Sequence, residues 1–386
     1  MHLFYDVALS MISSTGILTI DLAAIQSNWL YVADALRMGS ECAAAVKADA
    51  YGVGAIEVVK ALYAVGCKSF YVVTLHEAIE LRNALPKDIS IYVLGGIPVG
   101  MKAIFIDQNL IPVLYTRAAV DEWLSFCELH QRAFPCVLKI NTGMTRLGLD
   151  NAELDQLLRV AVNTPLLNPV LLMSHLACAD EPEHPLNGEQ LQRFSSAVAK
   201  TKVIFPGIKA SLANSSGTFL GDAYHFDMVR IGAALYGINP QAAFPNPLKS
   251  VINLKLPVLQ IRLAERPEFV GYGATAAIAG GTRLAVVAGG YADGVHRSLG
   301  LAPKGQIDGV DVKAIGRLSM DSFVFDISHI DGDPDYIEVI NNELSVDGLI
   351  RSHNTLGYEV LTSLGRRYRR HYMSACLGNS TGAGHE

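Results

Sequence analysis

Five polar residues stand at the ends of short apolar segments, and their side chains are of the kinds that transfer protons and bind anions. Lys47, Lys139, His175, Asn214 and Arg230 each close or follow a segment that is typical of a β-strand. The carboxyl ends of parallel strands meet at one face of a barrel, where barrel enzymes hold their active sites. One such residue alone is as easily a satisfied side chain at the rim of a core. Five from separate strands favour a common site.

Lys47 lies in the segment AVKADAYG, among small apolar residues. One interpretation is a lysine whose stem packs on apolar surface while its amine reaches water. The other is an amine in an apolar pocket, where desolvation disfavours the ammonium and lowers its pKa. A lysine of the second kind attacks aldehydes to form a Schiff base, which would indicate an aldehyde cofactor.

Two turns rich in small residues follow the last strands of the alternating region. They are NSSG at 214–217 and RIGA at 230–233. Free backbone N–H groups at such turns bind phosphate, and phosphate sites are frequent after the last strands of a barrel. Ordinary tight turns between a strand and a helix have the same composition, so the pattern leaves both interpretations open.

The elements that must position these residues alternate between strands and helices. Strands are predicted at 16–20, 43–46, 70–73, 91–94, 111–114, 137–140, 170–174, 209–212 and 227–231. Asp21 and Thr116 are predicted to cap the helices that follow them. The strands are apolar on both faces, which leaves an open doubly wound sheet or a closed (β/α)8 barrel. No GxGxxG follows a strand, and this favours the barrel. Nine candidates are one more than a barrel needs, so the first strand pairs elsewhere or one prediction is wrong.

The pattern changes after FPNPLKS at 244–250, where helical periodicity becomes scarce. The following segments read as strands separated by turns, so we predict an α/β plus β protein: a (β/α)8 barrel over residues 1–246 and a mostly-β domain over 247–386. Three glycine-rich segments in the second domain carry Tyr272, Tyr291 and Asp321. Glycine–aromatic turns are also common in β-proteins, so these segments alone do not define a site.

Composition excludes several classes of protein. The 386 residues are 50% hydrophobic and 18% charged, which is not the composition of a disordered chain. A net charge of -6 argues against nucleic-acid binding, and the short basic segment GRRYRRHY at 365–372 reads as surface or interface. Six scattered cysteines without a CxxC motif predict free thiols and no metal. The absence of long apolar runs and of a signal-like start predicts a cytoplasmic protein that does not enter a membrane.

Taken together, the segments resemble bacterial alanine racemase, a fold-type III family that uses pyridoxal 5'-phosphate (PLP). The motifs follow the family order from about residue 17 to 372: AVKADAYG, INTGMTRLGL, SHLACAD, NSSG, RIGAALYG, GYGAT, GYADG, RLSMD and GYEVLTSLG. Two positions depart from the family pattern, since Val53 stands in place of histidine and Asn141 in place of aspartate. The resemblance implies a barrel followed by a β domain, which agrees with the independent reading of the elements.

The resemblance also implies a mechanism with two bases on opposite faces of the substrate Cα. Lys47 would carry PLP and act on D-alanine, and Tyr272 would act on L-alanine. A tyrosine is a difficult base because its ordinary pKa is about 10. His175 and Arg230 match the cationic network that would stabilise its phenolate. Arg230 would also face the pyridine nitrogen and keep it unprotonated, because an arginine does not give up its proton.

The remaining site residues are matched motif by motif. The cofactor-binding set that the resemblance implies is Lys47, Tyr51, His175, Asn214, Ser215, Arg230, Gly232, Ala233 and Tyr358. Arg146, Met320 and Tyr291 would bind or admit the substrate. Lys139 is a candidate for carbamylation, which would turn it into an anion that holds Arg146. The family works as a head-to-tail homodimer in which the β domain of one chain, with its Tyr272 and Met320, completes the active site of the other.

The resulting expectation is a racemase that interconverts L- and D-alanine and supplies D-alanine for peptidoglycan. A broad-specificity racemase acting on serine and alanine is the nearest alternative. A non-catalytic PLP-binding protein is an alternative of another class, but such proteins lack the β domain. A decarboxylase of the same fold type would need a glutamate at the position of Arg230 and a catalytic cysteine in the β domain, where the only late cysteine is Cys376.

Overall fold

The computed structural model describes residues 15–295, 304–350 and 356–374, and the chain forms two compact units. The β unit comprises Met1–Ile25, Val251–Ser345 and Gly365–Glu386. The barrel unit comprises Gln26–Ser250 and Val346–Leu364. The chain therefore passes from one unit to the other more than once.

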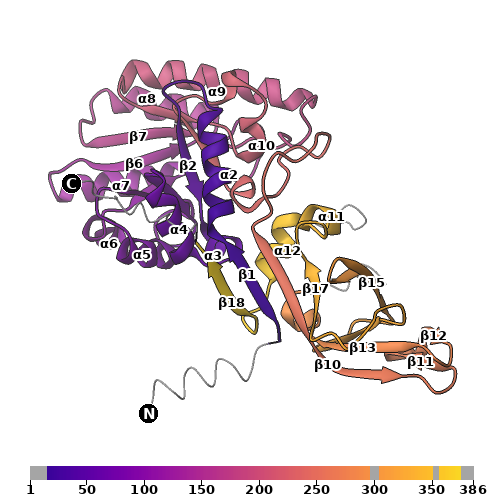
Figure 1. The fold of residues 1–386 in the computed structure, drawn as a ribbon. Coiled ribbons are helices and arrows are strands. Elements are labelled where there is room, and N and C mark those ends of the chain that lie inside the picture. Colours follow the sequence, from indigo (N-terminus) through magenta and orange to yellow (C-terminus); the bar gives the residue numbers. More distant parts are fainter. Residues whose placement is uncertain (1–14, 296–303, 351–355, 375–386) are drawn as a thin grey trace, which may run out of the picture. The chain divides into compact units, whose positions relative to one another are not determined.

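Eight parallel strands form the barrel, as the alternating sequence predicts (Figure 1). They are β2 (Glu41–Ala45), β3 (Ser69–Val72), β4 (Ser90–Val93), β5 (Ile111–Leu114), β6 (Phe134–Lys139), β7 (Leu167–Met173), β8 (Lys209–Ser211) and β9 (Met228–Ile231). Their order is β8-β7-β6-β5-β4-β3-β2-β9. Two backbone bonds close the ring between β8 and β9: Asp227 N donates to the Ala210 carbonyl at 3.0 Å, and Arg230 N donates to the Ala213 carbonyl at 3.0 Å.

Helices precede or connect these strands, and the two predicted caps are confirmed. The helices are α2 (Leu22–Asp34), α4 (Ala55–Ala64), α5 (Leu75–Ala84), α6 (Lys102–Asp107), α7 (Arg117–Leu129), α8 (Asn151–Ala161) and α9 (Pro185–Ile204). The Asp21 carboxylate accepts from Ala24 N at 2.9 Å, and Thr116 Oγ1 accepts from Ala119 N at 3.2 Å. Each satisfies a backbone donor that a helix leaves free at its first turn.

The inside of the barrel is packed with side chains rather than open. Ala43, Tyr71, Tyr92, Val113, Val137, Leu171, Met173 and Met228 form one buried cluster. The rings of Tyr71 and Tyr92 stack with centroids 4.5 Å apart. A ligand must therefore bind at an end of this barrel, because no channel runs through it.

Two short helices from late in the sequence belong to the barrel unit. They are α11 (Val346–Ile350) and α12 (Gly357–Ser363). The Asp347 carboxylate accepts from Asn239 N at 3.1 Å and from Asn246 Nδ2 at 2.8 Å. Gly52 lies so close to α12 that a Cβ there would come within 2.5 Å of the Leu361 carbonyl oxygen. These contacts fix Tyr358, near the start of α12, on the barrel unit.

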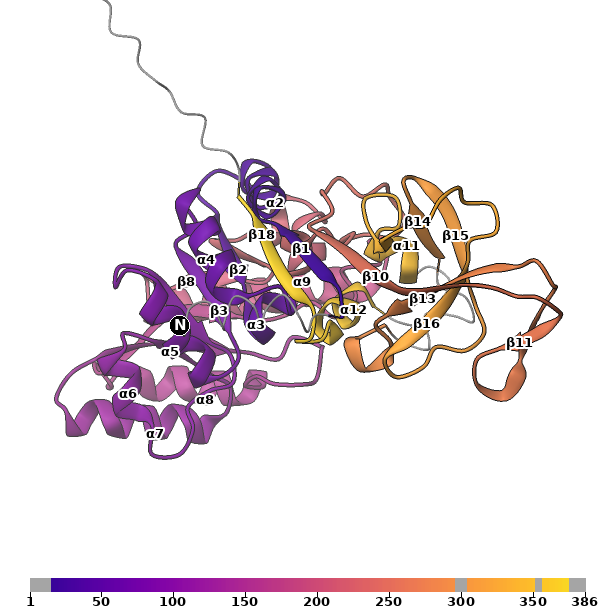
Figure 2. The same cartoon turned by 60° about the horizontal axis from the view of Figure 1, so that its bottom comes forward.

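The β unit is built around a closed antiparallel ring of six strands. Its members are β10 (Ile252–Leu263), β13 (Arg283–Ala288), β16 (Ser322–Asp326), β15 (Val310–Ile315), β14 (Lys304–Ile307) and β17 (Tyr336–Ile340). β1 (Ile17–Asp21) pairs with β10 on one side and with β18 (Arg369–Met373) on the other, as Figure 2 shows. The first of the nine strand candidates thus pairs outside the barrel, one of the two outcomes that the sequence left open.

A small hairpin and two helical turns complete the β unit. β11 (Glu268–Val270) and β12 (Ala276–Ile278) pair with each other, and η3 (Tyr272–Ala274) connects them. The turn η4 (Tyr291–Asp293) follows β13. Tyr272 is therefore carried on the loop of the hairpin, and Tyr291 on the turn after a core strand.

The described residues contain no helix long and apolar enough to cross a membrane. Five cysteines lie in the described part of the chain and are free thiols, and Cys376 lies outside it. Within the same part, no group of three or more His, Cys, Asp or Glu side chains is placed to hold a metal ion.

Candidate active site

Lys47 begins a left-handed turn at the end of β2. In the segment α3 (Lys47–Tyr51), Ala48, Asp49, Ala50 and Tyr51 have φ of 54°, 54°, 53° and 58°. Each residue in this region costs about 1–2 kcal/mol relative to a right-handed conformation, and a run of four without glycine is rare. The surrounding structure must stabilise it. Nothing in AVKADAYG signals this conformation, so the sequence analysis did not predict it.

Hydrogen bonds from several elements hold the turn. Within it, Ala50 N donates to the Val46 carbonyl at 2.9 Å, and Gly52 N donates to the Ala48 carbonyl at 2.8 Å. The Asp49 carboxylate accepts from Ala55 N at 2.8 Å, which ties the turn to the start of α4. The direction in which Lys47 leaves β2 is therefore fixed.

Four cationic side chains surround His175 in the barrel unit. Burial lowers the pKa of Lys139 to about 8, and the charges of Arg230, Arg146 and Lys47 add to this effect. Burial and the charge of Arg146 also lower the pKa of Lys47. His175 is half-buried, and desolvation of its imidazole, together with the charges of the same four cations, holds its pKa well below the ordinary value. The imidazole is therefore neutral near pH 7.

Arg230 is the most firmly held of these cations. It lies on β9 and is buried, with its guanidinium donating to Ser211 Oγ and to the Ser174 carbonyl at 2.6 Å. Its Nη2 also lies 3.4 Å from His175 Nδ1. Because a guanidinium only donates, Nδ1 accepts there and the imidazole proton is assigned to Nε2. The bonds to Ser211 and Ser174 thus fix the direction of the Arg230 side chain, and its contact with Nδ1 fixes the tautomer of His175.

A small cavity opens beside these cations. It is lined by Lys139, Ile140, Asn141, Thr142, Met144, Arg146, Leu147, Ser174 and His175. Asn141 organises the loop that carries Arg146, because its Oδ1 accepts from Gly143 N at 3.1 Å and from Thr145 N at 3.0 Å. Its Nδ2 donates to Asp150 at 3.3 Å, which a carboxylate at this position could not do. The departure from the family pattern therefore adds one hydrogen bond to Asp150 where an aspartate would meet repulsion.

The two small-residue turns meet in a second part of the site. Asn214 Oδ1 accepts from Gly217 N at 2.8 Å and caps α10 (Ser215–Thr218). Ser215 Oγ accepts from Gly232 N at 2.9 Å and from Ala234 N at 3.1 Å. The Ser215 hydroxyl thus joins the turn after β8 to η2 (Ala233–Tyr236), the turn after β9.

Tyr51 lies against the same turns. A Cβ at Gly232 would come within 2.4 Å of Tyr51 Oη, so any larger residue there would displace the Tyr51 hydroxyl. Burial raises the pKa of Tyr51 to about 12, and the neighbouring Tyr358 adds to the shift. Tyr51 therefore keeps its proton and can donate to an anion. The hydroxyls of Tyr51, Ser215 and Tyr358 with the backbone at Gly232 form what we call the hydroxyl cradle.

In the β unit, the predicted residues Tyr272, Tyr291 and Met320 are exposed, by 71%, 42% and 52% of their surface. Two backbone bonds hold the second and third together: Tyr291 N donates to the Ser319 carbonyl at 3.2 Å, and Ala292 N donates to the Met320 carbonyl at 3.1 Å. Exposed aromatic and sulfur-containing side chains on ordered turns are suited to contact another molecule.

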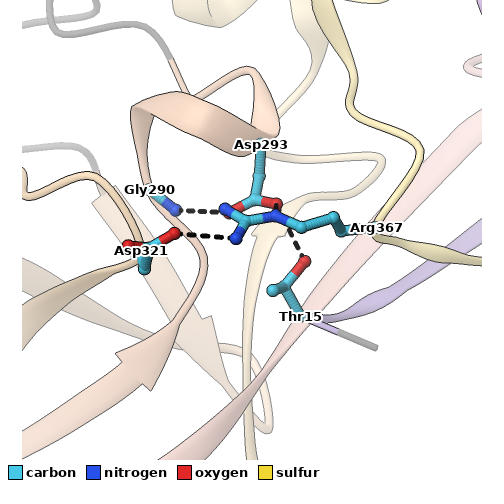
Figure 3. A network of polar contacts seen from close by, with 5 residues as sticks. All are labelled: Thr15, Gly290, Asp293, Asp321 and Arg367. Atoms are coloured by element: carbon cyan, nitrogen blue, oxygen red, sulfur yellow. Dashed lines mark hydrogen bonds and ion pairs between the residues drawn. The ribbon is translucent and has the colours of Figure 1, made fainter. Parts of the chain in front are cut away.

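A buried carboxylate supports these two turns (Figure 3). Asp293 is fully buried and accepts four hydrogen bonds: from Thr15 Oγ1, Gly290 N, and Nε and Nη2 of Arg367, at 2.7–3.0 Å. Arg367 Nη1 also binds Asp321 at 2.7 Å. Sequence reasoning missed this role, since it placed Arg367 in a basic segment read as surface or interface. The motifs GYADG and RLSMD were noted, but nothing local linked them to an arginine so far along the chain.

The fold and the two parts of the site define a class of protein: a barrel enzyme in which a strand-end lysine, a cation cluster and a cradle of hydroxyls offer donors suited to an anionic group. Two family models match the chain, "Alanine racemase, N-terminal domain" over residues 20–240 and "Alanine racemase, C-terminal domain" over residues 251–372. The chain therefore belongs to the alanine racemase family, whose members are isomerases of the amino-acid racemase class.

Individual relatives agree with this assignment. An alanine racemase of Rhodospirillum rubrum is 45% identical over 366 residues, which cover 93% of this chain and 96% of that protein. One from Rhizobium meliloti is 40% identical over 379 residues, covering 94% and 98%. The crystal structure of alanine racemase from Bartonella henselae, with covalently bound pyridoxal phosphate, has a TM-score of 0.87 and 35% identity, covering 93% of this chain and all of that one.

Proposed function

We propose that this chain interconverts L- and D-alanine with PLP bound at Lys47, and that it does so as a homodimer in the cytoplasm. The observation that carries the proposal is the cation cluster around neutral His175, which lies in the same barrel unit as Lys47 and the hydroxyl cradle. A relative of solved structure carries pyridoxal phosphate covalently, which supports the choice of cofactor.

The residues present fit PLP on two counts. Among the charges that shift the pKa values of Lys47 and Lys139, the only carboxylate is that of Glu77, and it acts on Lys47 alone. An anionic cofactor and a substrate carboxylate would supply the missing negative charge. The hydroxyl cradle offers protonated hydroxyls and a glycine without Cβ, which suits a phosphate at close approach.

PLP, when bound, supplies the electron sink that acidifies the Cα proton of alanine. Lys47 Nζ would move that proton on one face, since its lowered pKa makes the neutral amine more available at neutral pH. The hydroxyl of Tyr272 would move a proton on the other face. Two bases on opposite faces are what racemisation needs, because the proton must leave one side and another must enter opposite. Lys47 would serve D-alanine and Tyr272 L-alanine.

Arg230 would hold the pyridine nitrogen of the cofactor. Its guanidinium is fixed by Ser211 and Ser174 and donates without giving up its proton. The ring nitrogen facing it would remain unprotonated. This limits the negative charge that the ring can accept and so favours return of the proton to Cα over side reactions.

Arg146 would bind the substrate carboxylate, with Lys139 behind it. Near neutral pH a lysine with a pKa of about 8 is in part neutral, and a neutral amine adds to CO2 with release of one proton. The carbamate formed would be an anion that pairs with Arg146 instead of repelling it. High-resolution density with a bare amine at Lys139 would reject this modification.

The proposed homodimer gives each domain a separate role. Residues 1–246, joined by Tyr358 on α12, would carry the cofactor, and the other residues of 247–386 would complete the active site of the second chain. Tyr272, Tyr291 and Met320 would enter that neighbouring site, with the Met320 N–H on the substrate carboxylate and Tyr291 narrowing the entrance for a small side chain. The D-alanine formed would feed peptidoglycan synthesis.

The experiment is to incubate the purified protein with L-alanine and PLP in D2O. Circular dichroism and proton NMR of the substrate Cα are followed, with Lys47→Ala as the control. We expect the optical signal to decay to zero, deuterium to enter Cα and no pyruvate to form. A wild-type protein that holds PLP but changes neither signal would refute alanine racemisation and favour a non-catalytic PLP-binding protein. A parallel incubation with L-serine tests the broad-specificity alternative.

A further inference from the structure

The capping glutamate of helix α5 does more than cap its helix. Thr74 Oγ1 accepts from Glu77 N at 3.2 Å, and Glu77 Oε2 accepts from Thr74 N at 2.9 Å, which is the reciprocal pair of a capping box. Glu77 Oε2 also accepts from Val73 N at 2.9 Å. One oxygen of the carboxylate therefore accepts from both backbone N–H groups at the start of α5.

The other oxygen of Glu77 reaches a different element. Oε1 accepts from Ala48 N at 2.6 Å. Ala48 is the residue after Lys47 and the first with positive φ in the left-handed turn. A charge-assisted bond of this length is among the stronger hydrogen bonds in proteins. The bond lies at the start of the left-handed turn, where the backbone conformation is most unfavourable.

A second capping box in the barrel unit shows that this reach is not required for capping. At the start of α8, Glu153 Oε2 accepts from Asp150 N at 2.9 Å. No bond from Glu153 to another element is observed among the described residues. The bond from Ala48 to Glu77 is thus an additional feature of α5, placed beside the lysine of the candidate site.

The charge of Glu77 acts in the same place. Lys47 faces the cations Arg146 and Lys139, and burial and Arg146 lower its pKa. Glu77 opposes this shift. The carboxylate is therefore close enough to Lys47 for its charge to be felt, while it contacts the backbone and not the amine.

We infer that Glu77 is a positioning residue for Lys47, because its carboxylate holds the left-handed turn from which the Lys47 side chain leaves β2. The inference rests on the proposed function only for the importance of Lys47. The contact itself is a property of the protein without cofactor or substrate.

The test compares Glu77→Gln with Glu153→Gln. Glutamine has one acceptor oxygen, so at position 77 it can keep the helix cap but its amide N–H2 cannot accept from Ala48 N. At position 153 one acceptor suffices. Both variants lose one negative charge and keep the size of the side chain, which makes Glu153→Gln a matched control.

The first readout is backbone hydrogen exchange over residues 46–55, measured on the protein without PLP. We expect exchange about tenfold faster in Glu77→Gln, the change expected for loss of one hydrogen bond to a charged group, and no change in Glu153→Gln. Equal exchange in wild type and Glu77→Gln would overturn the inference. An equal increase in both variants would also overturn it, since it would report a general loss of stability.

The second readout uses the protein with PLP. Glu77→Gln should bind PLP about tenfold more weakly and show kcat about tenfold lower, with KM for alanine within about twofold of wild type, because Glu77 does not contact the substrate. Removing the charge should also shift the pH midpoint of PLP uptake down by about half a unit. Unchanged PLP uptake would overturn the inference. A wild type without racemase activity would refute the proposed function and leave the exchange result standing.

Should Glu77→Gln fail to fold, Glu77→Asp provides the second variant. Aspartate keeps the negative charge in the first turn of α5, but it is one methylene shorter and cannot reach both Thr74 N and Ala48 N. We expect the same increase in exchange over residues 46–55. Wild-type exchange in Glu77→Asp would overturn the claim that the reach of the side chain matters.

Discussion

Replacing Asp293 with asparagine tests how far the β unit depends on one buried carboxylate. The wild-type side chain is fully buried and accepts four hydrogen bonds, two of them from Arg367. Asparagine keeps one acceptor oxygen, so two bonds are lost and its N–H2 faces donors. At about 1.5–3 kcal/mol for each bond to a charged group, the two lost bonds cost about 3–5 kcal/mol.

The matched control is Asp321→Asn. The Asp321 side chain is 58% exposed and has a single ion pair with Arg367, at 2.7 Å. An exposed pair of this kind contributes about 0–1 kcal/mol. Both substitutions remove one charge next to the same arginine, so their difference isolates the effect of burial and of the additional hydrogen bonds.

The assay is urea unfolding followed by circular dichroism, with hydrogen exchange over residues 284–294. Both tryptophans, Trp29 and Trp123, lie in the barrel unit, so their fluorescence provides a reference for that unit. A loss of about 3–5 kcal/mol is a large part of the roughly 5–15 kcal/mol that stabilises a typical domain. If Asp293→Asn costs no more than Asp321→Asn, the reasoning that assigns support of the turns to this carboxylate is wrong.

Three further predictions concern the barrel unit. The pKa of Lys139 is lowered from 10.5 to about 8, so between these values the unfolded chain binds more protons and stability rises with pH. In CO2-free buffer, Lys139→Met should therefore stabilise the apoprotein by at most about 3 kcal/mol at pH 7, with a smaller gain toward pH 10 in urea unfolding. Gly232→Ala should weaken PLP retention at least about tenfold in dialysis, because the new Cβ would come within 2.4 Å of Tyr51 Oη; retention equal to wild type would contradict the close approach. Asn141→Asp should cost less than about 1 kcal/mol at neutral pH, from repulsion across the 3.3 Å contact with Asp150, and the cost should vanish in acid; a loss that persists in acid would exclude repulsion as its cause.

The hydrophobic pattern of the sequence was enough to predict the barrel, because each strand and helix is formed by consecutive residues. The runs at 111–114 and 227–231, for example, correspond to β5 (Ile111–Leu114) and β9 (Met228–Ile231). Alternation and burial on both faces then restrict the topology to very few choices. The closed ring of the β unit could not be predicted in this way, because pairs such as β13 with β16 join segments far apart in sequence.

The sequence could predict that these strand-end residues come together, but not the geometry around them. Strand ends in a barrel converge, so Lys139, His175 and Arg230 could be expected together. The left-handed turn after Lys47 and the reach of Glu77 depend on contacts between elements. A capping box at Thr74 is readable from sequence, but a second bond from the same carboxylate is not.

Because α12 lies late in the sequence, the hydroxyl cradle can be completed only near the end of synthesis. A ribosome completes all eight barrel strands by Ile231, yet Tyr358 is added more than a hundred residues later. A nascent chain that already holds Lys47, Ser215 and Gly232 therefore lacks one hydroxyl of its cradle. Its affinity for a phosphate would increase only after α12 has been synthesised and has packed on the barrel unit. An excised barrel ending at Ser250 would remain permanently in that early state.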